Sequence, residues 1–151
     1  MLFRSVENLE IAAAPIAVAH RNPELVATLR TLRTVVRVPA EQPHSLAAAR
    51  VSREPQIVTE VSPEMYQQYG LAPAELEMLR TLAPRSYVGL PMLARGILVG
   101  TLMLVISESD RRFQPSDLEH LTNIAARAGL ALENARLYDH QRWVEIGRAH
   151  V

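Results

Sequence analysis

The sequence predicts a mixed α/β fold of the α+β type, in which an antiparallel sheet is combined with a long C-terminal helix. Two apolar runs, 86–94 and 97–106, are joined by the short turn Arg95-Gly96, as in a β-hairpin. Both runs are apolar at nearly every position, so we expect both faces of this part of the sheet to be covered. After the hairpin, apolar residues recur at steps of three and four from Leu118 onward, which indicates a helix.

Length and composition limit the classes of function. The 151 residues fit one domain, and 48% hydrophobic with 21% charged residues is an ordinary globular composition. The 16 basic and 16 acidic side chains cancel, so nothing favours nucleic acid or an anionic membrane as a partner. The absence of cysteine excludes disulfides, thiol nucleophiles and thiolate metal sites. Without a membrane-length apolar run or a secretion signal, we expect a cytoplasmic domain with no membrane contact.

Both ends of the chain resemble a translated sequencing adapter. The codons GAG ATC GGA AGA GCA CAC GTC encode Glu145–Val151, and they match a common adapter read in frame. The reverse complement of that adapter contains GTG CTC TTC CGA TCT, which gives Met1–Ser5 when GTG is the start codon. We therefore expect 6–144 to be the natural segment and leave 1–5 and 145–151 out of the reasoning about the fold.

The elements expected before the hairpin are short. Asn22 and Pro23 suit the start of a helix, and apolar spacing continues that helix to about Val36. The prolines and polar residues that follow indicate a loop at 38–43. The remaining expected elements are a strand at 11–20, a helix at 45–53, a strand at 56–61 and two helices at 63–69 and 73–82.

Two features of the second half carry further expectations. Pro91 has no N–H to donate, so its strand should have a bulge or a free edge at this point. Pro115 and Asp117 suit the first turn of the last helix, whereas Gln114 is a poor N-cap. A helix over 115–142 would be about 42 Å long at about 1.5 Å per residue. Its apolar seam consists of Leu118, Leu121, Ala125, Ala128, Leu132 and Ala135.

Several spaced motifs in this half together resemble the C-terminal half of a GAF domain. They are Arg85–Leu93, Arg95-Gly96, Gly100–Leu102, Arg112-Phe113 with Asp117-Leu118, and Ala131–Tyr138. The resemblance implies a GAF/PAS-like antiparallel sheet with helices on both faces and a small-molecule pocket on one of them. It also implies that the family's first helix and first strand lie upstream, so that 6–144 is a GAF domain without them. Such a fragment would expose apolar sheet surface, and we expect it to be marginally stable.

The candidate ligand-pocket residues are Tyr66, Tyr69, Arg85 and Tyr87, which lie in or beside the segments that usually cover the pocket in this family. Packing and edge contacts are the alternative role for these side chains. The five histidines share no spacing typical of a metal site. No nucleophile, base and orienting group occur together, so we expect neither a metal site nor catalysis by this segment.

The sequence tests the family's ligands only in part. Covalent attachment of bilin is excluded, because the chain has no cysteine. Cyclic-nucleotide-binding members carry an Asn-Lys-Phe-Asp-Glu signature. Phe113 and Asp117 have suitable spacing for it, but Leu118 stands in place of the final acid, which disfavours a cyclic nucleotide. Haem remains an alternative, with His44 as a conceivable axial ligand.

We therefore expect a sensory domain of a bacterial signal-transduction protein that binds an unknown small molecule. Two copies would pair along the seam of the last helix and relay a ligand-induced shift to a C-terminal output domain. The alternative for that helix is ordinary packing on its own sheet. Gln141–Val144 slightly resembles the run-in to the phosphoacceptor helix of a two-component sensor histidine kinase, with a serine phosphatase or a diguanylate cyclase as other possible parents. The competing function is a dimerisation or interaction module that binds no ligand.

Overall fold

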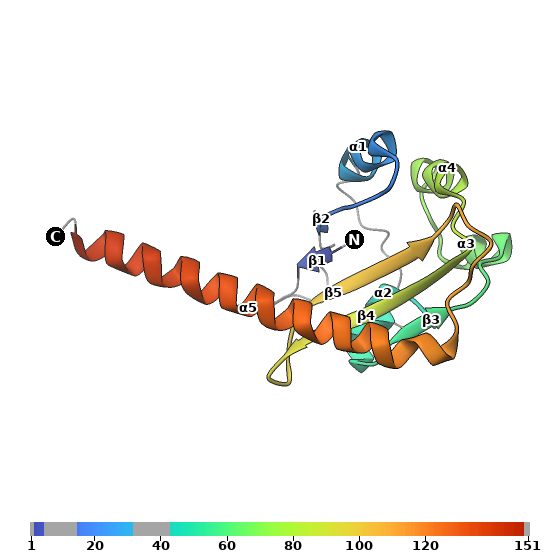
Figure 1. The fold of residues 1–151 in the computed structure, drawn as a ribbon. Helices are drawn as coiled ribbons and strands as arrows, with labels where there is room; N and C mark the ends of the chain where they lie inside the picture. Colours follow the sequence, from blue (N-terminus) through green and yellow to red (C-terminus); the bar gives the residue numbers. More distant parts are fainter. Residues whose placement is uncertain (1, 5–14, 32–42, 150–151) are drawn as a thin grey trace.

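The computed structural model describes residues 2–4, 15–31 and 43–149 (Figure 1). Its elements are β1 (Leu2–Arg4), β2 (Pro15–Ala17), α1 (Pro23–Thr31), α2 (Leu46–Ser52), β3 (Gln56–Val58), α3 (Pro63–Gln68), α4 (Pro73–Leu82), β4 (Ser86–Ala94), β5 (Ile97–Ile106), the 3-10 turn η1 (Pro115–Asp117) and α5 (Leu118–Ala149). All strand pairs are antiparallel, in the order β2-β1-β5-β4-β3. The predicted combination of an antiparallel sheet with a long C-terminal helix is confirmed.

The predicted hairpin is the centre of this sheet. β4 and β5 pair along their whole lengths, from Ser86 opposite Ile106 to Ala94 opposite Ile97. Arg95 and Gly96 form the turn with positive φ angles of 51° and 80°. Two successive residues in this region make the turn whose twist matches that of the adjoining strands, which is why the strands continue without splaying.

The irregularity expected at Pro91 is confirmed. The register between β4 and β5 shifts between Met92 and Leu93, directly after the proline. On its other side, β4 pairs with β3 only over Tyr87–Gly89, so Pro91 lies beyond the end of β3. The missing N–H therefore falls where the sheet is already interrupted.

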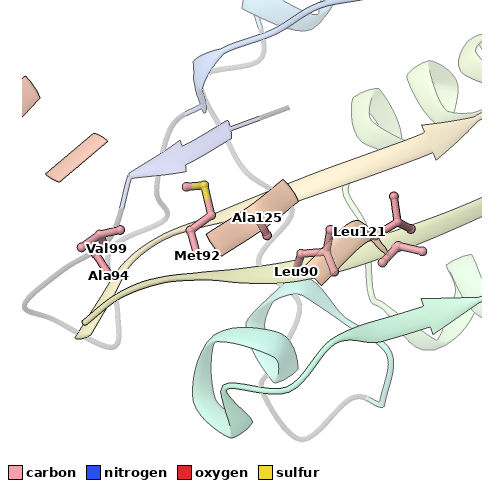
Figure 2. Packing of buried hydrophobic residues seen from close by; sticks show 7 residues of the cluster. Leu90, Met92, Ala94, Val99, Leu121 and Ala125 are labelled. Carbon is pink, nitrogen blue, oxygen red and sulfur yellow. The ribbon is translucent and has the colours of Figure 1, made fainter. Parts of the chain in front are cut away.

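Helices cover both faces of β4, as the two continuous apolar runs predict. On one face, α5 packs on a core of Val88, Leu90, Met92, Ala94, Val99, Leu121 and Ala125 (Figure 2). Gly89 belongs to the opposite face, because successive residues of a strand alternate. A Cβ atom at Gly89 would lie 3.2 Å from Cδ1 of Leu46 in α2. The absent side chain at Gly89 thus lets α2 approach the sheet closely.

The last helix is longer than the predicted 115–142. It begins with η1 and continues as α5 for 32 residues, which is about 48 Å at about 1.5 Å per residue. Gln114 makes no side-chain cap, as expected. Instead its backbone N–H donates to Oδ2 of Asp117 at 2.8 Å. The C-terminal part of α5 projects beyond the sheet (Figure 1).

The short elements before the hairpin agree with the sequence where they are described. Oδ1 of Asn22 accepts from the N–H of Glu24 at 3.0 Å, which confirms the predicted helix start, and α3 and α4 occupy their predicted ranges. Ser45 caps α2 by accepting from the N–H of Ala48 at 2.9 Å. The strand expected at 56–61 is shorter and ends at Val58. The strand expected at 11–20 ends at Ala17, and only its part 11–14 lies outside the described residues. The helix end near Val36 and most of the 38–43 loop also lie outside them.

β1 falls within the five residues that the codon match predicts to be adapter-derived. It pairs with Gly100–Leu102 of β5 on one side and with β2 on the other. The adapter origin of these residues, and the absence of the family's own first strand from 6–144, stay predictions.

Candidate functional site

Three of the four predicted pocket residues come together around a chain of hydrogen bonds. Tyr66 lies in α3, Tyr69 directly follows it, and the spacing of three places both on one side of the helix. The hydroxyl of Tyr69 is 3.0 Å from that of Tyr87 in β4. The hydroxyl of Tyr87 in turn donates to the backbone carbonyl of His44 at 2.9 Å. The chain therefore links the end of α3, the strand β4 and the turn before α2.

The direction of each hydrogen bond follows from proton counting. A phenol has one O–H, whereas a backbone carbonyl can only accept. The proton of Tyr87 goes to His44, so the bond between the two phenols requires Tyr69 to donate. The hydroxyl proton of Tyr69 is thereby used within the protein, and its oxygen has only acceptor capacity left.

Burial raises the pKa values of two of these phenols, which are neutral at neutral pH in any case. Tyr87 is 7% exposed. Its burial, and to a smaller extent its contacts with Tyr69, raise its pKa above the ordinary value of a tyrosine. Tyr66 is half-buried, and burial, with a smaller contribution from Tyr69, also raises its pKa. In the described part of the chain, no hydrogen-bond partner accompanies the Tyr66 hydroxyl. The cluster is thus uncharged and partly buried, and among the described residues the O–H group of Tyr66 has no hydrogen-bond acceptor.

Arg85, the fourth predicted residue, makes a different contact. Its Nη1 lies 2.6 Å from Oδ1 of Asp110, in the segment after β5. The Asp110 side chain is 99% exposed, so this pair lies at the surface, where such ion pairs contribute about 0–1 kcal/mol. The guanidinium is therefore committed to an exposed carboxylate, while the three tyrosines form the candidate site.

Two residues support the site in ways that were not predicted, although His44 had been named as a haem-ligand candidate. His44 enters it through its backbone carbonyl, a group that every residue carries, so no side-chain pattern could indicate it. Ser86 is completely buried, and its Oγ donates to the carbonyl of Val58 at 2.8 Å and accepts from the N–H of Phe113 at 3.0 Å. Ser86 ties β3 and the segment before η1 to β4, beside Tyr87. A serine at the head of an apolar run was the only available signal.

The predicted pairing seam of α5 lies mainly on the domain's own sheet. Leu121 and Ala125 are buried in the core, and Leu118, Ala128 and Leu132 pack against it. Ala135 alone of the six is exposed. Ordinary packing, the alternative for this helix, thus accounts for the seam as far as Leu132. Leu121 and Ala125 are therefore not free for pairing while α5 lies on the sheet, whereas the partly buried Leu118, Ala128 and Leu132 and the exposed Ala135 keep some accessible surface. Pairing along the seam stays a prediction.

Metal and membrane chemistry have no support in the described part of the chain. No group of three or more His, Cys, Asp or Glu residues there is arranged to hold a metal ion. None of its helices combines the length and apolar character needed to cross a membrane.

The chain is similar in sequence and fold to known sensory domains. A family model for the GAF domain matches residues 5–132. The second GAF domain of DevS from Mycobacterium smegmatis superposes with a TM-score of 0.58 at 16% identity, over 93% of this chain and 82% of that one. A GAF domain/HD domain protein from Geobacter sulfurreducens also gives 0.58 at 16% identity, over 84% and 77%. The GAF domain of the cyanobacteriochrome TePixJ gives 0.55 at 21% identity, over 90% and 78%. No curated protein matches the chain.

Proposed function

This chain belongs to the GAF domain family, and we propose that it binds a small molecule at the tyrosine cluster and relays binding through α5 to an output domain. GAF domains are sensory, ligand-binding modules of signalling proteins and are not catalysts themselves. The observation that carries the proposal is the hydrogen-bond chain from Tyr69 through Tyr87 to His44. It places polar groups of three separate segments together on partly buried surface, which is typical of a ligand site.

The helices beside this cluster support a binding role. Neither α3 nor α4 contains a buried residue, whereas β4 is buried at every position except Leu93. Helices that bury few side chains can be displaced at a lower free-energy cost than the core. Tyr69, at the end of α3, is therefore well placed to move with α3 when a ligand binds, and its hydrogen bond to Tyr87 would pass that displacement to β4.

The position of β4 supports the relay. Tyr87 lies on β4, and α5 packs on the same strand farther along, where a Cβ atom at Gly129 would lie 3.1 Å from the carbonyl oxygen of Leu93. Such a close backbone contact transmits small displacements, because neither partner can yield by turning a side chain. A ligand that shifts β4 at Tyr87 would thereby shift α5 and whatever follows it.

Native mass spectrometry of the protein purified from its producing cells tests the binding step. We expect a small molecule on the wild-type protein and its loss in Tyr69→Phe, which removes a hydroxyl of the cluster. Ser109→Ala is the control, because it also removes a hydroxyl but from an exposed position outside the cluster. If the wild-type protein carries no small molecule and takes none from an extract of its source cells, the alternative of a ligand-free interaction or dimerisation module is favoured.

The relay requires pairing and an output domain, and each has its own test. We propose a homodimer through the exposed part of α5 beyond Leu132, with a two-component sensor histidine kinase as the parent and a serine phosphatase or diguanylate cyclase as alternatives. Sedimentation of the chain with its upstream segment restored should show a dimer, and a strict monomer at high micromolar concentration would contradict the pairing. The genomic sequence that contains the coding segment 6–144 tests whether an output domain follows it.

A further inference from the structure

The hydroxyls of Tyr66 and Tyr69 are complementary in what they can offer to a ligand. The Tyr69 hydroxyl donates a hydrogen bond to Tyr87, so its oxygen can only accept further hydrogen bonds. The Tyr66 hydroxyl has no hydrogen-bond partner within the described residues, so its proton is available for donation. The two side chains lie three residues apart in α3 and at its end, which brings their Cβ atoms to about 5–6 Å. The tyrosine cluster thus offers one donor and one acceptor, and Tyr69 lies close enough to Tyr66 to help raise the pKa of Tyr66.

The charge of the surroundings restricts the ligand further. The pKa values of Tyr66 and Tyr87 are raised by burial and by the neighbouring tyrosines, and among the described residues no cationic side chain contributes to these shifts. The guanidinium of Arg85 contacts the exposed Asp110 at the surface. A carboxylate or phosphate held against neutral phenols would lose its hydration without gaining a counter-charge, which is costly. A neutral group avoids that cost.

We propose that Tyr66 and Tyr69 together recognise a neutral ligand that carries a hydrogen-bond acceptor and an N–H donor side by side, as a cyclic amide does. The Tyr66 O–H donates to the ligand carbonyl, and the Tyr69 oxygen accepts from the ligand N–H. Tyr87 acts as a positioning residue, because its bond to His44 determines that Tyr69 presents lone pairs and not a proton. This inference rests on the proposed binding function and specifies the chemical class of the ligand.

Three probes of nearly equal size separate the possibilities. Oxindole is a cyclic amide with an adjacent carbonyl and N–H, N-methyloxindole lacks the N–H, and phenylacetate is an anion. Binding of each probe to the full chain is titrated by ligand-observed NMR. We expect oxindole to bind about tenfold more tightly than N-methyloxindole, since one hydrogen bond is lost and an acceptor is left unpaired. Phenylacetate should bind most weakly.

Variants assign the two hydrogen bonds. Tyr69→Phe should abolish the preference for oxindole over N-methyloxindole, and Tyr66→Phe should weaken both about three- to tenfold. Ser109→Ala, which removes an exposed hydroxyl outside the cluster, should leave all three affinities unchanged. Partial unfolding of a variant weakens the binding of oxindole and N-methyloxindole by the same factor. The ratio of their affinities therefore still tests the hydrogen bonds in a variant that is less stable.

The outcomes distinguish the ligand class from the binding function. If phenylacetate binds as tightly as oxindole and the tyrosine variants weaken both, the site is supported and the neutral-amide class is wrong. If oxindole binds equally to the wild type, Tyr66→Phe and Tyr69→Phe, the assignment of the two hydrogen bonds is wrong. If none of the probes binds, the neutral-amide class is wrong, whereas the proposed binding function is decided separately by native mass spectrometry.

Discussion

Replacement of Gly129 by alanine tests the close contact between α5 and β4. Gly129 is buried, and a Cβ atom there would lie 3.1 Å from the carbonyl oxygen of Leu93, 3.2 Å from its carbonyl carbon and 3.3 Å from its nitrogen. All three are backbone atoms next to the irregularity in β4, so the strand must move to admit the methyl group. Such distances are shorter than ordinary van der Waals contact.

Two effects of opposite sign decide the result of Gly129→Ala. Alanine favours the helical backbone over glycine by about 1 kcal/mol. Overpacking a tightly packed site typically costs about 1–3 kcal/mol, and the upper part of that range applies where backbone must move. With about 2 kcal/mol for overpacking, we expect a net loss of about 1 kcal/mol in the free energy of unfolding, against the direction of helix propensity.

Urea unfolding of the two proteins under identical conditions measures this difference. The reverse substitution Ala131→Gly, at an exposed position of the same helix, is the control and should cost about 1 kcal/mol through propensity alone. Gly89→Ala should be milder than Gly129→Ala, because its nearest neighbour at 3.2 Å is the flexible end of the Leu46 side chain. If Gly129→Ala stabilises the protein by about 1 kcal/mol, α5 does not approach the backbone of β4 closely. The contact through which β4 would displace α5 is then absent.

The remaining predictions concern hydrogen bonds of the site and its supports. Ser86→Ala should lower the free energy of unfolding by about 1–3 kcal/mol in urea titrations, because the carbonyl of Val58 and the N–H of Phe113 lose their hydrogen-bond partner. The control Ser109→Ala, at an exposed position, should change it by less than about 0.5 kcal/mol. Equal effects of the two substitutions would contradict the role of Ser86. Ser45→Ala should cost about 1 kcal/mol through loss of the α2 cap, and Ser45→Gly only a few tenths; a neutral Ser45→Ala would argue against the cap. The free energy of unfolding should fall as the pH rises above about 10, because tyrosines of the unfolded chain ionise there while the raised pKa keeps Tyr87 protonated in the folded protein. Tyr87→Phe should reduce that slope, and an unchanged slope, followed by urea titrations at several pH values, would show that Tyr87 is not responsible.

The elements that the sequence predicted well are those whose signals are local. The turn Arg95-Gly96, the asparagine cap of α1 and the proline at the start of η1 each act within a few residues, and each is found where expected. The irregularity after Pro91 has the same local origin, a missing N–H. These features depend on backbone conformation alone, so no knowledge of distant contacts was needed.

The candidate site was predictable only as a list of side chains. Tyr66 and Tyr69 share one side of α3 because of their spacing, but the bond from Tyr69 to Tyr87 joins residues 18 apart. The partner of Tyr87 is a backbone carbonyl 43 residues away. Arg85, adjacent in sequence to the same strand, is paired instead with Asp110 at the surface. Sequence indicates which groups are available, whereas the packing of α3 and β4 selects which of them meet.

The long last helix divides the two kinds of information most sharply. Its start follows from the residues alone, because Pro115 and Asp117 suit the first turn of a helix. Its apolar period does so too, because apolar residues at steps of three and four lie on one side of a helix. The period is the same whether that stripe faces a sheet of its own domain or a second copy, because both surfaces exclude water equally well. Only the tertiary structure, by placing Leu121 and Ala125 against β4 and leaving Ala135 exposed, decided that the first five residues of the seam belong to the core.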